Sequence, residues 1–247
     1  NNYVQFNKRE KINSVKYENG INCLLEINSN IFAIGNLIGD IIIVNYKTLK
    51  TVQIIREHNG TIISLNLLHD KGILSCSADK TMKKIRLNPD GLKYIVEFVF
   101  NGYNNYIFKG IELMNSYKIV TCSWDDKLFV WDCKSINEYD NTLIFNKGER
   151  VQDLLEINAN YFVSISEDNN LKFWNSNNFK TFAVINYIKC IGAPNALCKL
   201  NDCILCILDY HEIQLVDLIK KNLINTISVI EGTLSCIIKL SDNSIFI

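Results

Sequence analysis

Histidine, cysteine and acidic residues are the side chains of this chain that could perform acid–base, nucleophilic or metal chemistry. The 247 residues contain three histidines, His58, His69 and His211, and these lie far apart in the sequence. A transition-metal site needs several such donors at short, defined spacings. We therefore expect no metal site, no catalytic residue and no cofactor.

A short cysteine run comes closest to a ligand motif. Cys203 and Cys206 follow Cys198, but they are three positions apart on a predicted strand and would point to opposite faces. The acid pairs Asp125-Asp126 and Glu167-Asp168 fall in predicted turns, where aspartate has a structural use. No glycine-rich phosphate loop or nucleophile elbow is found. The sequence predicts a protein that is not an enzyme.

Charge and cysteine usage indicate the class of partner and the compartment. Lys and Arg together number 26, as do Asp and Glu, so no net field favours nucleic acid or an anionic membrane as partner. Nine cysteines, most of them at apolar positions, indicate reduced core thiols. We expect no signal peptide and no membrane span. The expected location is the cytoplasm, a reducing compartment, with the nucleus as an alternative.

These residues lie in a unit of about forty residues that returns along the chain. Each copy has a short apolar strand, a second apolar run, an Asp-centred turn and a third strand that ends in a large side chain. The first strands start at steps of 41, 45, 44, 43 and 40 residues, at Ile21, Ile62, Ile107, Val151, Pro194 and Leu234. The apolar runs are short and bounded by Asn, Asp and Gly, which predicts buried strands and not helices.

The third strands share one spacing. In three copies an aspartate precedes the large residue by six positions: Asp79 before Ile85, Asp125 before Trp131, and Asp168 before Trp174. A tight turn favours Asp, and a flat side chain at the end of the strand can cover the neighbouring sheet. Val44 and Val216 occupy the Trp position in the other two complete copies.

This pattern resembles the WD40 repeat family over essentially the whole chain. The best copy is Ser123-Trp124-Asp125-Asp126-Lys127-Leu128-Phe129-Val130-Trp131-Asp132. The resemblance implies an all-β propeller of four-stranded blades. It also implies structural roles for Asp79, Asp125, Asp168, Trp131, Trp174 and His58.

The family's hydrogen-bonded tetrad is incomplete in every copy. In the second copy it would use His58, Ser77 and Asp79, while Ile85 replaces its Trp. The third and fourth copies keep the Asp and the Trp, together with Ser123 or Ser166, and lack the His.

The two ends of the chain align with the two halves of one further blade. We predict six blades, closed by pairing of N-terminal strands in 1–19 with C-terminal strands in 233–247, which would remove open sheet edges. Part of a seven-bladed propeller is the alternative. The predicted blades are 21–60, 61–103, 106–148, 149–190, 193–231, and 232–247 joined with 1–19, in one domain spanning 1–247. Because residue 1 is Asn, we expect this domain to belong to a longer polypeptide.

The resemblance places a partner site on one face of the propeller, at positions beside the first strands and before the turn aspartates. The third and fourth blades supply Tyr106, Phe108, Trp124, Arg150, Gln152 and Glu167 there. The other blades supply smaller or less polar residues: Gly20, Asn22, Thr61, Ile63, Ala78, Ala193, Asn195, Thr233 and Ser235. Aromatic residues and Arg dominate binding hot spots, so we predict that Trp124 and Arg150 carry the site.

We expect a non-enzymatic scaffold that binds a peptide or protein partner on this face, as one subunit or domain of a larger complex. One alternative is recognition of a modified or acidic peptide as a substrate-receptor module, which would need several Arg or Lys on the face. Another is a structural subunit of a coat, ciliary or nuclear assembly. An exposed apolar patch on the flank would favour that role.

Overall fold

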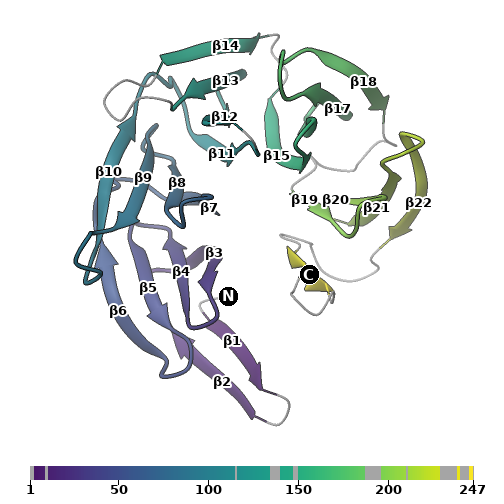
Figure 1. Cartoon of the computed structure of the whole chain (residues 1–247). Coiled ribbons are helices and arrows are strands. Elements are labelled where there is room, and N and C mark those ends of the chain that lie inside the picture. Colours follow the sequence, from purple (N-terminus) through teal and green to yellow (C-terminus); the bar gives the residue numbers. More distant parts are fainter. Residues whose placement is uncertain are drawn as a thin grey trace. The chain divides into compact units, whose positions relative to one another are not determined.

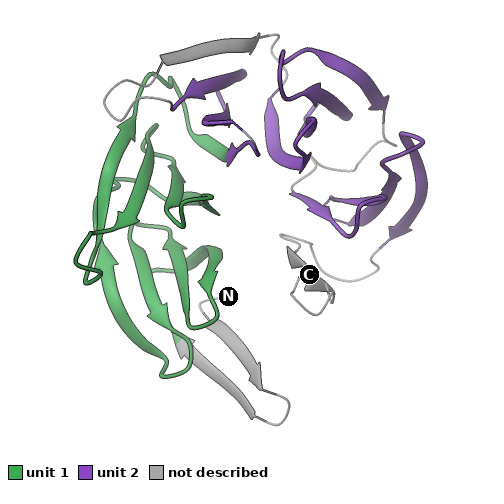
Figure 2. Cartoon of the chain, viewed as in Figure 1, with its two compact units in different colours: residues 1–110 green, residues 111–247 purple. Residues whose placement is uncertain are grey.

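A computed structural model shows a chain of β-strands joined by turns, with no helix among the residues it describes (Figure 1). The described residues are 3–8, 11–114, 116–133, 140–146, 150–186, 196–209, 211–228, 238–239 and 245–246. The chain divides into two compact units, residues 1–110 and 111–247 (Figure 2).

The first unit contains two four-stranded antiparallel sheets. Their strand orders are β3-β4-β5-β6 and β10-β9-β8-β7, so each strand pairs with the next along the chain. The strands are β3 (Ile21–Asn28), β4 (Ile31–Asn36), β5 (Ile41–Asn45), β6 (Lys50–Ile55), β7 (Ile62–Leu67), β8 (Ile73–Ser77), β9 (Met82–Leu87) and β10 (Tyr94–Phe100).

The second unit contains two further sheets of this kind, ordered β15-β16-β17-β18 and β19-β20-β21-β22. A third sheet is ordered β11-β12-β13-β14; residues 107–110 of β11 belong to the first unit and the rest of this sheet to the second. The strands are β11 (Ile107–Glu112), β12 (Lys118–Ser123), β13 (Lys127–Asp132), β14 (Asp140–Asn146), β15 (Val151–Asn158), β16 (Tyr161–Ser166), β17 (Asn170–Asn175), β18 (Thr181–Asn186), β19 (Ala196–Lys199), β20 (Ile204–Leu208), β21 (Glu212–Asp217) and β22 (Asn222–Ser228). The predicted all-β class with four-stranded sheets is confirmed.

Asn and Asp side chains close the hairpin turns at repeated positions. Asn28 Oδ1, for example, accepts two backbone N–H groups of its turn, at 2.9 and 3.1 Å. The residues that act in this way are Asn28, Asn158 and Asn201 between first and second strands, and Asn45, Asn175 and Asp217 between third and fourth strands. A short amide or carboxylate imitates the backbone hydrogen bond of a turn, so these residues set where each strand ends.

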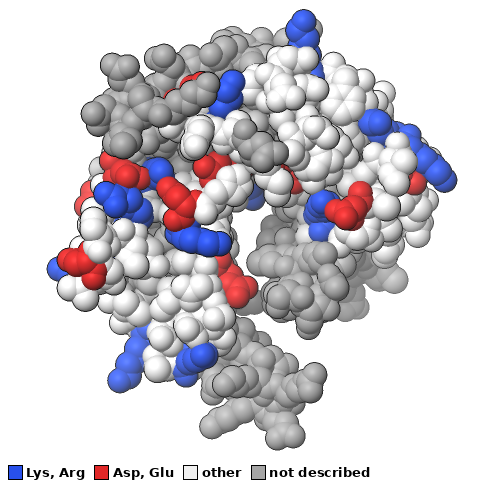
Figure 3. Space-filling model, viewed as in Figure 1, with Lys and Arg blue, Asp and Glu red and all other residues white. Residues whose placement is uncertain are grey.

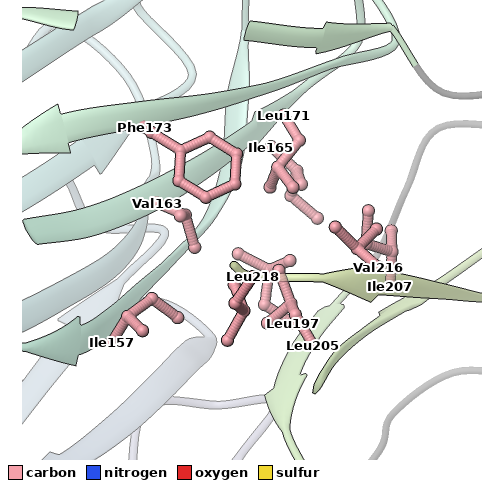
Figure 4. Packing of buried hydrophobic residues seen from close by; sticks show 10 residues of the cluster. All are labelled: Ile157, Val163, Ile165, Leu171, Phe173, Leu197, Leu205, Ile207, Val216 and Leu218. Carbon is pink, nitrogen blue, oxygen red and sulfur yellow. The ribbon is translucent and has the colours of Figure 1, made fainter. Parts of the chain in front are cut away.

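The hydrophobic core of each unit lies between neighbouring sheets. In the first unit it contains Ile27, Ala33, Ile41, Ile43, Ile55, Ile62, Leu65, Ile73 and Ile85. In the second unit it contains Ile157, Val163, Ile165, Leu171, Phe173, Leu197, Leu205, Ile207, Val216 and Leu218 (Figure 4). Ile85 and Val216 are fully buried, so the smaller residues at the Trp position still serve as core.

The two ends of the chain form short hairpins. β1 (Tyr3–Lys8) pairs with β2 (Lys11–Lys16), and β23 (Ile238–Lys239) pairs with β24 (Ile245–Phe246). The joining of these hairpins into one blade, the count of six blades and the single domain with its blade boundaries stay predictions. Several predicted positions lie outside the described residues: Ala193, Pro194, Asn195, Thr233, Leu234 and Ser235.

Candidate interaction site

The turn between β12 and β13 holds Trp124 and the two aspartates that follow it. The Asp125 N–H donates to the Ser123 hydroxyl at 3.3 Å. Asp126 has a φ of 63°, in the left-handed region, and Asn169 has a φ of 60° in the matching turn between β16 and β17. Asp and Asn adopt this conformation more readily than most other side chains. The local sequence therefore favours the turn that presents Trp124.

Arg150 lies directly before β15 and extends over Trp124. Its carbonyl accepts the Glu167 N–H at 3.0 Å, which holds its backbone against the end of β16. Its guanidinium carbon lies 5.2 Å from the centroid of the Trp124 ring, within cation–π range. Its Nε lies 3.9 Å from Asp126 Oδ1 and its Nη1 lies 3.6 Å from Glu167 Oε2. One ring and two carboxylates, from two neighbouring sheets, thus hold this cation.

Gln152 completes the group. Its Nε2 donates to Glu167 Oε1 at 3.1 Å, so Glu167 contacts both Gln152 and Arg150. We call Trp124, Asp126, Arg150, Gln152 and Glu167 the Trp124 patch. The side chains of Arg150 and Glu167 are 46% and 38% exposed, and Trp124 is half-buried. The structure therefore brings together all four partner-site residues predicted in the second unit.

Tyr106 and Phe108 were predicted for the same site and belong to the first unit. Tyr106 is 39% exposed, whereas Phe108 is half-buried. Their membership of a common surface with Trp124 stays a prediction, as does the partner-binding role of all six residues.

Charges in and beside the Trp124 patch are mixed. Asp125 lies 3.6 Å from Lys127 Nζ, next to the pairs that Arg150 forms. The carboxylates of Asp125, Asp126 and Glu167 thus outnumber the cations of Arg150 and Lys127. A site for acidic or phosphorylated segments needs a surplus of Arg or Lys, which this group does not supply.

A chain of hydrogen bonds links β8 to the segment before β7 and to the turn between β8 and β9. His58 Nδ1 lies 2.8 Å from Asp79 Oδ2, and His58 Nε2 lies 2.8 Å from Ser75 Oγ. The serine that bonds to His58 is thus Ser75 and not the predicted Ser77, whose hydroxyl donates to the Gly60 carbonyl and accepts the Asp79 N–H at 3.1 Å. Burial alone would raise the pKa of Asp79, but hydrogen bonds from His58, Thr81 and a backbone N–H hold it well below its ordinary value.

The corresponding residues of the next two sheets differ from the prediction in the same way. Trp174 Nε1 donates to Ser164 Oγ at 2.8 Å, and Trp131 Nε1 donates to Thr121 Oγ1 at 3.2 Å. Ser166 donates to Asp168 Oδ1 at 2.6 Å. The two indoles therefore donate to Thr121 and Ser164, each two positions before the serine that the prediction named.

A buried lysine, Lys172, lies beside Asp168, the turn aspartate of the fourth copy, and was not predicted from the sequence. Lys172 is 8% exposed, and its Nζ lies 3.3 Å from Asp168 Oδ2. Lys83 occupies the same place in β9 and donates to the Glu57 carbonyl. Both follow a turn aspartate by four positions, a spacing visible in the sequence. These charges have structural partners and are not available to a ligand.

The first sheet presents a second feature that sequence reasoning missed. Leu37 and Ile38, in the turn between β4 and β5, are 50% and 54% exposed. Alignment on the third strands puts Leu37 in the position of Trp124, so this signal was available. The Thr61 hydroxyl donates to the Leu37 carbonyl at 2.8 Å, and the Leu37 N–H donates to the Asn19 carbonyl at 3.4 Å. The turn is therefore tied to its surroundings while both side chains face solvent.

Other kinds of site are not found in the part of the chain that the structure describes. No group of three or more His, Cys, Asp or Glu residues there could hold a metal ion. Within the same residues, no helix is long and apolar enough to cross a membrane. Burial raises the pKa of the Cys76 and Cys206 thiols to about 12, so these cysteines are poor nucleophiles.

Comparison of the sequence with known proteins gives one partial likeness. No protein-family model matches the chain. The tRNA modification GTPase MnmE of Mesoplasma florum is 30% identical over 131 residues, which cover 51% of this chain and 29% of that protein. The chain has no Gly-Lys pair, and so lacks the phosphate-binding loop that a P-loop GTPase uses.

Comparison of the structure with solved structures is more informative. The WD40 β-propeller domain of Doa1 superposes with a TM-score of 0.78 at 15% identity, covering 99% of this chain and 82% of that domain chain. The β-propeller domain of Myceliophteria thermophila Cps50 (Swd1) superposes with a TM-score of 0.66 at 12% identity, covering 81% of this chain and 66% of that one. Together with the repeated four-stranded sheets, these likenesses show that the chain has the fold of a WD40 β-propeller.

Proposed function

We propose that this chain is a protein-interaction module that binds a peptide or protein partner through the Trp124 patch. The observation that carries the proposal is the Arg150 guanidinium lying 5.2 Å from the Trp124 ring centroid, with both side chains partly exposed. The likeness to WD40 propeller domains supports an interaction role in general.

Arg and Trp are the residues whose truncation most often weakens an interface. A partner that closes over such a pair removes a large flat surface from water. Arg150 is already held by Trp124 and two carboxylates, so little side-chain freedom remains to be lost on binding. This pre-organisation favours the patch over a single exposed cation elsewhere on the surface.

The charge balance bears on the kind of partner. Because carboxylates outnumber cations in and around the patch, we expect a partner segment that is neutral or basic there. This charge balance argues against the alternative function, the recognition of acidic or phosphorylated segments.

The test is affinity purification from the native extract with wild-type chain and with the double variant Trp124→Ala/Arg150→Ala. Truncation of two hot-spot residues costs about 2 kcal/mol or more, which is about 30-fold in affinity, so specific partners should be lost from the variant. Tyr117→Ala is the matched control, because Tyr117 is an aromatic residue of the same unit that is 68% exposed and lies outside the patch. Circular dichroism should show all three proteins folded.

Recovery of the same partners by the double variant would overturn the proposal. Loss of the partners from Tyr117→Ala to the same extent would also count against it, because the effect would then not belong to the Trp124 patch.

A further inference from the structure

The outer strands of the fourth and fifth copies, β18 and β22, carry apolar side chains on both faces. Ala183 and Ile185 of β18 point inward and pack against the core of the second unit. The alternate residues Phe182 and Val184 point outward, and each is 51% exposed. A strand with one solvated face normally places polar residues there, so two outward apolar residues call for an explanation.

A bulge in each strand turns one of these residues outward. In the pairing of β17 with β18, Phe173 and Trp174 face Ala183 and Thr181, which leaves Phe182 as the extra residue. In the pairing of β21 with β22, Leu215 and Val216 face Asn225 and Leu223, which leaves Ile224 as the extra residue. Bulges commonly redirect a side chain. Here both leave a large apolar side chain half exposed, and the Phe182 ring lies edge-on to the rings of Tyr161 and Phe173, at 5.8 and 6.0 Å between centroids.

Phe182 of β18 lies next to the turn that leads into β22. Leu223 of β22 shares its core with Ala183 and Ile185 of β18. In addition, Lys221 Nζ, in the turn before β22, lies 5.7 Å from the centroid of the Phe182 ring. We call Phe182 (51% exposed), Ile219 (69%) and Ile224 (51%) the outer patch.

Lysines surround one end of the outer patch. Lys180 and Lys220 are exposed, and Lys221 lies over Phe182. Asp217 of the same turn accepts the N–H groups of Ile219 and Lys220, both at 2.8 Å, and so serves the turn. Figure 3 shows Lys and Arg side chains gathered at the outer edge of the second unit. The charge beside the outer patch is therefore positive.

Glu212, the first residue of β21, pairs with Ser228 at the other end of β22. It accepts a hydrogen bond from the Ser228 hydroxyl at 3.5 Å, beyond Ile227. The lysines and Glu212 therefore lie at opposite ends of β22, with Ile224 between them.

We propose that the outer patch docks an extended segment of a partner protein in which apolar residues alternate with Asp or Glu. The apolar residues cover Phe182 and Ile224, and the acids reach the lysines at the rim. An extended segment fits because β18 and β22 are the last strands of their sheets, and outer strands recognise other strands through alternate side chains. An uncovered apolar strand at the end of a sheet would otherwise promote aggregation.

The test measures binding of fluorescent twelve-residue peptides to the whole chain by anisotropy. The probes are an alternating Leu–Glu peptide, an alternating Leu–Lys peptide and an alternating Ser–Glu peptide. We expect the Leu–Glu peptide to bind and the other two to bind at least about tenfold more weakly. Phe182→Ser/Ile224→Ser and, separately, Lys220→Glu/Lys221→Glu should each weaken Leu–Glu binding about tenfold.

Val52→Ser is the matched control for this experiment. Val52 is the extra residue of the same bulge in β6 of the first unit and is 55% exposed. Its replacement should leave Leu–Glu binding unchanged. Failure of the Leu–Glu peptide to bind, equal binding of the Leu–Lys peptide, or equal loss with Val52→Ser would overturn the proposal.

Two further measurements separate this partner from other occupants. Binding to vesicles of phosphatidylserine and phosphatidylcholine that is lost with Lys220→Glu/Lys221→Glu, in place of peptide binding, would overturn the proposal in favour of a membrane surface. A dimer in sedimentation velocity that Phe182→Ser/Ile224→Ser dissociates, without peptide binding, would overturn it in favour of a second copy of the chain.

Discussion

His58 and Asp79, which are 21 positions apart in the sequence, are joined by a contact of 2.8 Å between Nδ1 and Oδ2. The other ring nitrogen of His58 lies 2.8 Å from the Ser75 hydroxyl, so the imidazole connects the turn after β8 with the middle of that strand. The Asn59 N–H also donates to Asp79 Oδ2, at 3.0 Å. Because His58 precedes β7, these contacts tie the entry of the second sheet to its central turn.

Replacement of Asp79 by Asn should destabilise the protein in a pH-dependent way. The pKa of Asp79 is lowered in the folded state, since the hydrogen bonds from His58, Thr81 and a backbone N–H outweigh its desolvation by burial. A carboxylate with a lowered folded pKa contributes stability above its unfolded pKa of about 3.9, and that contribution is lost as the pH falls through the folded value. The difference in free energy of unfolding between wild type and Asp79→Asn should therefore be large at pH 6 and clearly smaller at pH 2.

Urea unfolding at the two pH values measures this difference. Asp70→Asn is the comparison variant, and its destabilisation should change less between the two pH values. The pKa of Asp70 is also lowered, but its side chain is half exposed and its ion pair with Lys84 is screened by solvent. The same destabilisation of Asp79→Asn at both pH values would contradict the expectation.

The buried pair of Trp174 and Ser164 should show coupling in a double-mutant cycle. Trp174 Nε1 donates to Ser164 Oγ at 2.8 Å, and the indole stacks on Phe162 at 6.1 Å between ring centroids. Trp174→Phe leaves a fully buried hydroxyl without this donor, which costs about 1–3 kcal/mol. In the Ser164→Ala background that hydroxyl is already absent, so Trp174→Phe should destabilise the protein by about 1 kcal/mol less there than in the wild type. Additive effects in urea unfolding would argue against the hydrogen bond.

The strands and their turns were predictable because their signals are local. The predicted first strands starting at Ile21, Ile62, Ile107 and Val151 are β3, β7, β11 and β15. A short apolar run that ends in Asn or Asp gives the start, the end and the buried face of a strand at once.

The hydroxyl partners of the tryptophans were not predictable from this pattern. Ser164 and Ser166 are two positions apart, so both point to the same face of β16, and alternation cannot distinguish them. The choice depends on how far the indole reaches from the neighbouring strand β17, which is a property of the packed sheet. The prediction named Ser166, which bonds to Asp168, whereas the indole of Trp174 donates to Ser164.

Four of the five residues of the Trp124 patch were predicted from the sequence, whereas Asp126 and the pairing of the charges were not. Aligning the copies places Trp124, Arg150 and Glu167 near one end of their sheets. The alignment does not show that Arg150 lies between two carboxylates, because side-chain directions at the turns depend on φ values such as that of Asp126. The sequence thus shows which charges are present and does not show how they pair.

Gly39→Ala should be much more damaging than Gly102→Ala. Both glycines have positive φ, 99° and 108°, so any side chain pays a similar conformational cost of about 1–2 kcal/mol. A Cβ at Gly39 would lie 2.4 Å from the His58 carbonyl oxygen, whereas a Cβ at Gly102 meets no atom within 4 Å. The overlap should add about 1–3 kcal/mol for Gly39→Ala alone. Thermal unfolding of the two variants checks this, and equal destabilisation would show that the turn moves away from His58 at little cost.

Asp153→Asn should loosen the contact between β15 and β19. Asp153 is 5% exposed, and its two oxygens accept the N–H groups of Leu154 at 2.8 Å and Leu197 at 2.7 Å. An amide has one oxygen, so its NH₂ group would face one of these donors, at a cost of about 1–3 kcal/mol for the buried group left unsatisfied. The Leu197 amide should then exchange its hydrogen faster, since this bond crosses from one sheet to the next. Gln152→Ala, at the adjacent position that faces the Trp124 patch, should leave Leu197 exchange unchanged. Native-state hydrogen exchange measures both variants, and unchanged protection of Leu197 in Asp153→Asn would mean that the bond to Asp153 does not limit its opening.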